Sequence, residues 1–291
     1  MTDTATPAAL AAPRPGRLRK ALRRHPTILW GGGLLGLVLL LAIAAPLAFT
    51  ADPKQVFPLD RLKGPTAEHW FGTDMLGRDI YSRTIYGARV SLIVGFSVAA
   101  CATVAGLAIG LIAGSNRWAD AVLMRVLDGI MSIPAVLLAI ALMAVSGAGI
   151  GNVILALTVA ETPGVARLVR GVVLSLREQP FIDAAVASGS TYRTILLRHM
   201  LPNTVAPLLV QGTYVCAAAM LLEAVLSFIG AGTPPDVPSW GNMMAEGRAY
   251  FAIAPQIILF PGLMLSVAVL AVNLIGDGLR DALDPRLARQ G

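Results

Sequence analysis

Two carboxylates stand close together in the segment "FGTDMLGRDIYS", at Asp74 and Asp79. A pair of acids at such a spacing can serve one reaction as general acid and general base. The same segment also has the composition of a loop that leads into a helix. Gly72 and Gly77 can turn the chain, because glycine adopts backbone angles that other residues avoid.

The loop interpretation is the stronger one, because the partners of acid–base catalysis are missing nearby. Asp79 is followed at helical spacing by Arg83 and then Arg89, so these side chains can pair along helical turns. No nucleophile, second base or metal-ligand cluster stands close to the two carboxylates. The sequence also lacks the G-x-S-x-G and H-E-x-x-H motifs, and its three histidines are scattered. The chain is therefore expected not to be an enzyme.

Nucleotide, metal and disulfide chemistry have equally little support. A phosphate-binding loop needs a lysine after a glycine frame, G-x-x-x-x-G-K-[ST]. The lysines Lys20, Lys54 and Lys63 follow no such frame. Cys101 and Cys216 fall inside apolar runs and lack the spacing of a zinc site or a disulfide framework. We expect no cofactor or metal in this chain, and any ATP must bind elsewhere.

Composition assigns the chain to the membrane. It is 56% hydrophobic and 14% charged, whereas soluble domains carry about 25% charged residues. A helix needs about 20 apolar residues to cross the hydrocarbon. Six stretches reach or approach this length, at 28–49, 90–113, 127–145, 150–168, 205–229 and 253–275. The expected fold is an all-α integral membrane protein with six transmembrane helices.

The distribution of lysine and arginine predicts the orientation. With the N-terminal end inside, 16 of the 23 basic residues lie in inner segments, as the positive-inside rule requires. This places the basic tail 1–27 and the C-terminal tail 277–291 in the cytoplasm, and the loop 50–89 outside. It also explains the net charge of +6 without nucleic acid. The first span resembles a cleaved signal peptide at 42–45, but its basic lead and apolar run are long for one.

One inner segment, "DAAVASGSTYRTILLRHMLPN", has the pattern of two short helices joined by a glycine. Pro180 suits the first turn of a helix at 181–188. Gly189 suits the position after that helix, where positive φ is needed. Ser190 can cap a second helix at 191–200, and Pro202 is expected to stop it.

The first of these helices is slim and carries one acid, Asp183, near its positive end. A slim helix that projects from a membrane protein can insert into the groove of a partner. An ordinary loop between two spans has the same general properties, so the residues alone leave both interpretations open.

The segment resembles the EAA loop of the inner-membrane permeases of ABC importers. That loop reads E-A-A, three residues, G, nine residues, an apolar residue, one more, and L-P. The matching positions here are Ala184, Ala185, Gly189, Leu201 and Pro202. Asp183 replaces the glutamate with its charge kept, and His199 stands at the apolar position, as is common in the peptide-importer branch.

Other segments resemble the C-type permeases of dipeptide, oligopeptide and nickel importers. They include "FGTDMLGRDIYSRTIYGARVSL", "EAVLSFIGAG" and "NLIGDGLRDALDPR", and together they cover most of the chain from about residue 68. The resemblance implies a type I importer fold, with a permease core at 90–276 and an EAA loop at 180–203. It also implies oligopeptide or dipeptide cargo, with nickel or glutathione as alternatives.

The resemblance further implies partners in a bacterial inner membrane. A second, homologous permease would complete the pore as a heterodimer. Two ATPase subunits would bind ATP and Mg, and an extracytoplasmic binding protein would deliver substrate. The first EAA helix would couple to an ATPase through Asp183, Ala184, Ala185, Gly189 and Ser190. A self-contained channel or receptor is the alternative from another class, but no selectivity device of its own is visible.

Two acids, Glu161 and Glu223, fall inside predicted spans. A charge at bilayer depth costs about 2.5–3.5 kcal/mol on insertion scales, so such residues usually face the bundle interior or water. Both are candidates for the substrate pathway. Glu161 could instead pair with an arginine of the partner permease or lie near the cytoplasmic interface with Arg167. Glu223 could equally have a structural or gating role.

Overall fold

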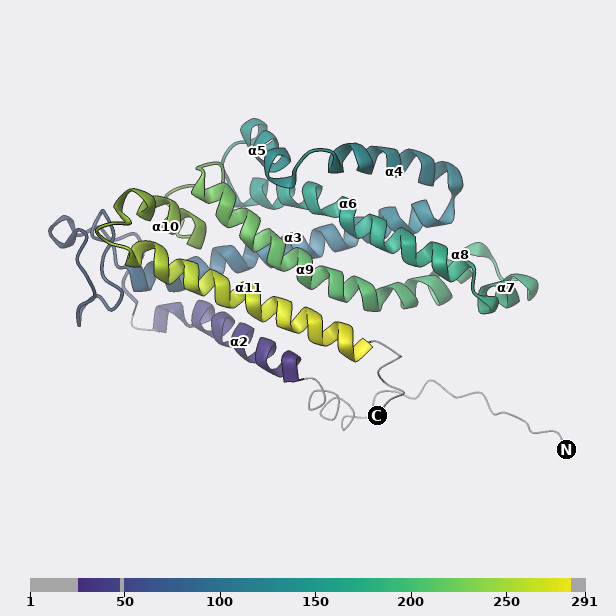
Figure 1. Ribbon diagram of the computed structural model, residues 1–291, viewed down its shortest axis with the longest axis horizontal. Coiled ribbons are helices and arrows are strands. Elements are labelled where there is room, and N and C mark those ends of the chain that lie inside the picture. The colour runs from purple at the N-terminus through teal and green to yellow at the C-terminus, as the bar shows by residue number, and fades with distance from the viewer. Residues whose placement is uncertain (1–25, 48–49, 284–291) are drawn as a thin grey trace.

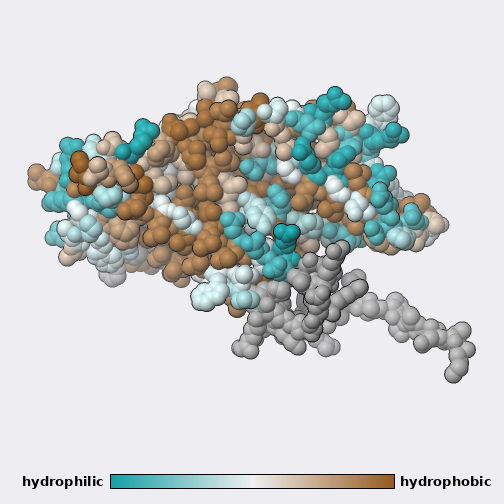
Figure 2. Space-filling model, viewed as in Figure 1, coloured by the Kyte–Doolittle hydropathy of each residue, from teal (hydrophilic) through white to brown (hydrophobic). Residues whose placement is uncertain are grey.

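The computed structural model describes residues 26–47 and 50–283, and its long helices run side by side along the long axis of the molecule (Figure 1). Five helices are long and apolar enough to cross a membrane. They are α2 (Pro26–Ile43), α3 (Ile80–Ser115), α6 (Ile150–Arg177), the continuous helix Tyr192–Phe228 and α11 (Gln256–Leu283). Apolar side chains form a band between more polar ends (Figure 2). This confirms the predicted membrane fold.

The predicted span at 127–145 is a broken one. It consists of α4 (Arg117–Met131) and α5 (Ala135–Ser146), which are bent by 89° to each other. Pro134 precedes α5, and the residue before a proline is driven away from helical angles. The residues of the break are exposed on this chain, and no side chain caps the start of α5. With the bent pair counted as one span, the described part of the chain has up to six.

Several helices extend beyond the predicted apolar runs. α3 begins at Ile80 rather than near 90, because Asp79 caps it by accepting a 2.7 Å hydrogen bond from the Ser82 amide. α11 continues to Leu283, so the predicted tail at 277–291 begins as helix. The first span ends earlier, at Ile43, and is followed by the short helix η1 (Ala45–Leu47). Positions 48–49 and most of both predicted tails lie outside the described residues.

Glycines bring α3 and α6 into close contact. Gly106, Gly110 and Gly114 lie one helical turn apart on α3 and face α6. A Cβ on Gly110 would lie 2.6 Å from both the Ala166 carbonyl oxygen and Val169 Cβ. Small residues at this spacing let two membrane helices approach until their backbones touch. The α3–α6 contact therefore depends on the absence of side chains at these positions.

Two further contacts complete the bundle. α2 lies along α11 (Figure 1), where Gly278 packs against Ile28. At the other end, α10 (Trp240–Gly247) covers α3 and α9 (Leu201–Phe228). Trp240 is fully buried there and donates its indole N–H to the Thr84 carbonyl at 3.0 Å. The spans are thus closed by a short helix at the end opposite the EAA-like segment.

Gly110→Val should separate α3 from α6, because the added side chain collides with backbone that cannot move away. We expect the free energy of unfolding to fall by about 1–3 kcal/mol, the usual cost of overpacking. Denaturation of the purified chain by SDS in mixed micelles measures this change. Gly171→Val on α6 is the matched control, since a Cβ there meets nothing within 4 Å. Equal stability of the two variants would contradict the contact.

Candidate functional site

The predicted helix–glycine–helix segment is present between two spans. α7 (Pro180–Ala187) follows α6 after a turn. Gly189 has φ +80°, as predicted. The amides of Gly189 and Ser190 donate to the carbonyls of Val186 and Ala185, at 2.9 and 3.1 Å. This pair of bonds is a Schellman motif, which ends a helix and requires the left-handed conformation that glycine adopts most easily.

Most of α7 faces solvent. Ile182 is its one buried residue, and Ala185 packs partly against the core, so this side attaches the helix to the bundle. Phe181 and Val186 flank this side and are 44% and 59% exposed. Asp183 and Ala184 are also exposed. The free face of α7 is therefore narrow, largely apolar and singly charged.

The second helix of the segment starts one residue later than predicted. Ser190 does not cap it, because the helix begins at Tyr192 and the position before it is Thr191. Thr191 caps instead, and its hydroxyl accepts from the Thr194 amide at 3.4 Å. The predicted cap at Ser190 is wrong by this single residue.

Pro202 does not stop the helix, which corrects the second prediction for this segment. α8 (Tyr192–Ile195) leads into the π-helical turn η3 (Leu196–Met200) and then into α9. The wider turn moves the ladder by one residue, so that the Leu201 amide donates to the Leu196 carbonyl. The Asn203 side chain donates to the His199 carbonyl at 2.6 Å. The result is one helix of 37 residues, Tyr192–Phe228.

Arginines fix the end of α6 from which α7 projects. Arg177 donates to the Gly114 carbonyl at the end of α3, at 3.1 Å. Arg170 pairs with Asp120 on α4, with Nη2–Oδ2 at 2.7 Å. Arg167 pairs with Asp128, also on α4, at 2.6 Å. The base of the α7 loop is thus attached to both neighbouring helices.

The two intramembrane acids have different surroundings. Glu161 is partly buried on α6, and no hydrogen bond or ion pair to it occurs within the part of the chain that the structure describes. Its suggested neighbour Arg167 is bound to Asp128 instead. Glu223 is fully buried and accepts from the Ser227 hydroxyl at 2.8 Å and from Ser91 at 3.5 Å.

The hydrogen-bond network around Glu223 continues into the loop before α10. Ser227 contacts Thr233, and Thr233 contacts Ser239 and Asn242. The network joins α3, α9 and α10 and uses hydroxyls to satisfy a buried acid, as burial of such a group requires. This geometry gives Glu223 a role in holding the bundle together.

The carboxylates Asp74 and Asp79 lie in a structural cluster, which confirms the loop-and-cap interpretation. Gly72 and Gly77 both have φ +78°. Asp79 caps α3 and contacts His69 Nδ1 at 3.1 Å. Asp74 accepts from Arg78 Nε at 2.6 Å and from Arg83. In the same loop, the hydrogen bond from Lys63 lowers the pKa of the partly exposed Asp60 carboxyl.

The predicted pairing of Asp79 with Arg83 and Arg89 along the helix is wrong. Arg83 turns to Asp74 and to Glu246 on α10, the latter at 2.6 Å. Arg89 donates to the Ala42 carbonyl at 2.6 Å. Glu246 was missed by sequence reasoning, since it is 163 residues away from Arg83 and no local pattern links the two.

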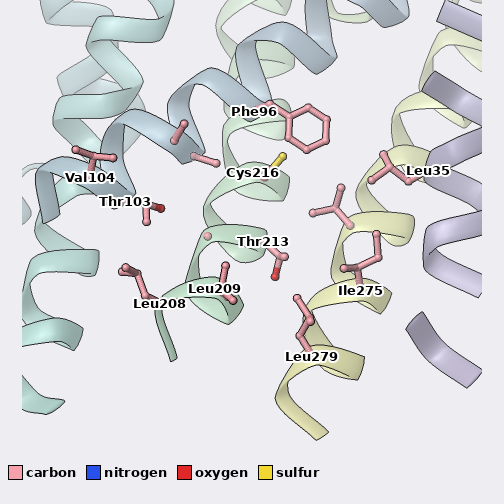
Figure 3. Close-up of a pocket in the computed structure, with 14 residues that line it drawn as sticks. Leu35, Phe96, Thr103, Val104, Leu208, Leu209, Thr213, Cys216, Ile275 and Leu279 are labelled. Atoms are coloured by element: carbon pink, nitrogen blue, oxygen red, sulfur yellow. The ribbon is translucent and has the colours of Figure 1, made fainter. Parts of the chain in front are cut away.

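An apolar groove of about 430 Å³ lies between α2, α3, α9 and α11 (Figure 3). Its lining includes Leu35, Phe96, Leu209 and Ile275, with only the Thr103 and Thr213 hydroxyls and the Cys216 thiol as polar groups. Such a surface suits hydrocarbon and offers no chemistry. Among the described residues, no three metal-ligating side chains come together.

The spans, the broken pair and the exposed helix between α6 and α9 define a class of protein, the multi-pass permease subunit of a membrane transporter. A chain of the methionine ABC transporter MetNI, solved in inward-facing conformations, has the same fold, with a TM-score of 0.58 at 22% identity over 70% of this chain and 98% of that one. The chain belongs to the family of binding-protein-dependent transport system inner membrane components, whose model matches residues 106–289.

Curated relatives extend this likeness to nearly the whole chain. A probable peptide ABC transporter permease of Sinorhizobium fredii is 57% identical over 92% of both chains. The dipeptide transport system permease DppC of Alkalihalophilus pseudofirmus is 43% identical over 92% of this chain and 88% of its own. The glutathione transport system permease GsiD of Pectobacterium atrosepticum is 42% identical over 92% and 90%. The chain is a multi-pass inner-membrane subunit of an ABC importer, which confirms the predicted family and fold.

Gly189→Val should misdirect α7, because a β-branched residue is strained at φ +80° by about 1–2 kcal/mol. The spans do not depend on this residue, since a Cβ there meets nothing within 4 Å. We expect normal membrane insertion but a steep fall in transport by the reconstituted complex. Gly189→Asn is the matched control, because asparagine tolerates the left-handed region. Transport by the valine variant at the level of the asparagine variant would show that the elbow has no such role.

Proposed function

We propose that this chain forms half of the translocation pore of a peptide importer and couples it to ATP hydrolysis through α7. The observation that carries this proposal is α7 itself, which projects beyond the ends of the spans (Figure 1) and leaves the side chains of Phe181 and Val186 exposed. Exposed apolar groups on a short projecting helix mark a surface that a partner covers. The partner that the family supports is an ATPase subunit, which binds the ATP and Mg.

The coupling residues are then assigned by position. Ile182 holds α7 on the bundle, while Asp183 and Ala184 face the ATPase and Ala185 lets the helix pack closely. Gly189 and Ser190 form the elbow that sets the direction of α7. Because the helix beyond the elbow runs unbroken into α9, a displacement of α7 moves a membrane span directly.

Peptides are the proposed cargo, since peptide and dipeptide permeases are among the relatives and cover most of the chain. A second homologous permease completes the pore, and an extracytoplasmic binding protein delivers the peptide. The N- and C-terminal ends lie in the cytoplasm, on the side of α7. We assign to Glu161, which is partly buried on α6, the role of binding the amino group of the peptide.

Cysteine labelling tests this orientation. In a background without Cys101 and Cys216, a cysteine at Asp236 should react with an impermeant maleimide in intact cells, since its side chain is 70% exposed at the outer end. A cysteine at Ala187, which is exposed on α7, should react only after lysis. Labelling of position 187 in intact cells would overturn the proposal, because no cytoplasmic ATPase could reach α7.

Glu161→Gln tests contact with the cargo. Removing the charge should raise the KM for peptide uptake severalfold and leave basal ATP hydrolysis unchanged, because only the ammonium partner is lost. Uptake and ATP turnover are measured together in vesicles that contain the complete complex. Glu223→Gln is the comparison, since it alters a buried network and should lower the yield of folded complex instead. Poor assembly of Glu161→Gln would show that Glu161 is a structural residue.

A further inference from the structure

A second cavity, of about 390 Å³, lies between α6, α9 and α11 in the half of the bundle that carries α7. Part of its wall is apolar and includes Leu168, Pro207 and Leu283. The rest of the wall presents the amide of Gln211, the phenol of Tyr214 and the guanidinium of Arg280. A hydrophobic wall with a few convergent polar groups is the usual form of a small-ligand site, and the volume lies within the range of about 300–1,000 Å³ that such sites have.

The polar side of this cavity is organised around Tyr214. Its hydroxyl donates to Asp277 Oδ1 at 2.7 Å, which ties α9 to α11. Arg280 follows Asp277 by one turn and lies close enough to hydrogen-bond the same hydroxyl. A guanidinium has five N–H donors, and one phenol oxygen leaves most of them for a ligand. With the Gln211 amide about one turn before Tyr214 on α9, the cavity offers donors to an anion with two oxygens.

The two cavities lie on opposite sides of α9 and differ in chemistry. The groove in Figure 3 is almost entirely apolar, as a lipid-facing surface should be. Charged residues on membrane helices face water or protein rather than lipid. Leu168 lies seven residues after Glu161 and therefore on the same face of α6. The cavity that Arg280 lines and the side chain of Glu161 therefore lie toward the same side of the bundle. This is the side suited to an aqueous pathway.

We propose that the cavity between α6, α9 and α11 binds the C-terminal carboxylate of a transported peptide as it leaves the pore. Arg280 and Gln211 donate to the carboxylate, Asp277 holds Tyr214 in place, and the apolar wall receives the last side chain. This inference rests on the proposed peptide transport. The phosphate of a lipid headgroup has similar acceptor oxygens, so an experiment must separate these two anions.

The test uses trialanine and its C-terminal amide as probes. Their binding is measured on the complete, nucleotide-free transport complex in phosphatidylcholine nanodiscs, without the binding protein. We expect the free acid to bind about tenfold or more tightly than the amide, since a hydrogen bond to a charged group contributes enough for this ratio. Arg280→Gln should remove the difference, and Arg280→Lys should keep part of it. Arg125→Gln, an equal charge change on the exposed face of α4, should keep all of it.

Three results would overturn the proposed site. They are equal or unmeasurable binding of acid and amide by the wild type, the same loss of both probes in Arg280→Gln, and disappearance of the acid preference when phosphatidylglycerol is added. The last result would assign the cavity to a lipid phosphate. Uptake of short peptides, measured in parallel with ATP and binding protein, keeps the two proposals apart. Uptake without an acid preference refutes only this site, whereas no uptake of any peptide refutes the proposed function.

Discussion

The close contact between α3 and α6 is the constraint on which the rest of the molecule depends. Apolar side chains gain nothing by leaving lipid for each other, so helices in a membrane associate through tight packing. Three glycines on α3 make such packing available, and α6 settles into the space that they leave. The Gly114 carbonyl then receives Arg177, the last residue of α6. Only two residues separate this anchor from α7, so the glycines of α3 set the position of α7.

Apolar length predicted the number and order of the spans, because it is a local property of the sequence. The breaks and ends of the helices were harder to predict from the sequence. Hydropathy cannot distinguish a straight helix from a bent pair, since the predicted run 127–145 crosses Pro134 with Asp128 as its one charged residue. For Pro202 the error was the opposite one, because a stop was predicted where the helix continues. A proline in a helix normally stops or bends it, but here a π-helical turn precedes Pro202 and the helix continues.

In the candidate site too, features set by neighbouring residues could be predicted, and features set by residues far apart in the sequence could not. The left-handed conformation of Gly189 could be predicted, because the end of a short helix next to a glycine has few solutions. The cluster of Asp74, Arg83 and Glu246 could not, since its members meet only after the whole bundle has formed. The two intramembrane acids, Glu161 and Glu223, also did not identify the cavity that Arg280 lines. The residues that line this cavity come from three helices, and Gln211 and Tyr214 do not stand out in the sequence.

The break between α4 and α5 has a consequence for the assembly of this protein. Its residues are exposed on the single chain, and no side chain caps the first amides of α5. Hydrocarbon cannot satisfy free backbone groups, so within a bilayer such a break must be covered by protein or water. In a single copy of the chain, the first amides of α5 have no side-chain cap. Cover for these amides must then come from water or from a neighbouring subunit, so this break suits the chain to assembly with a partner.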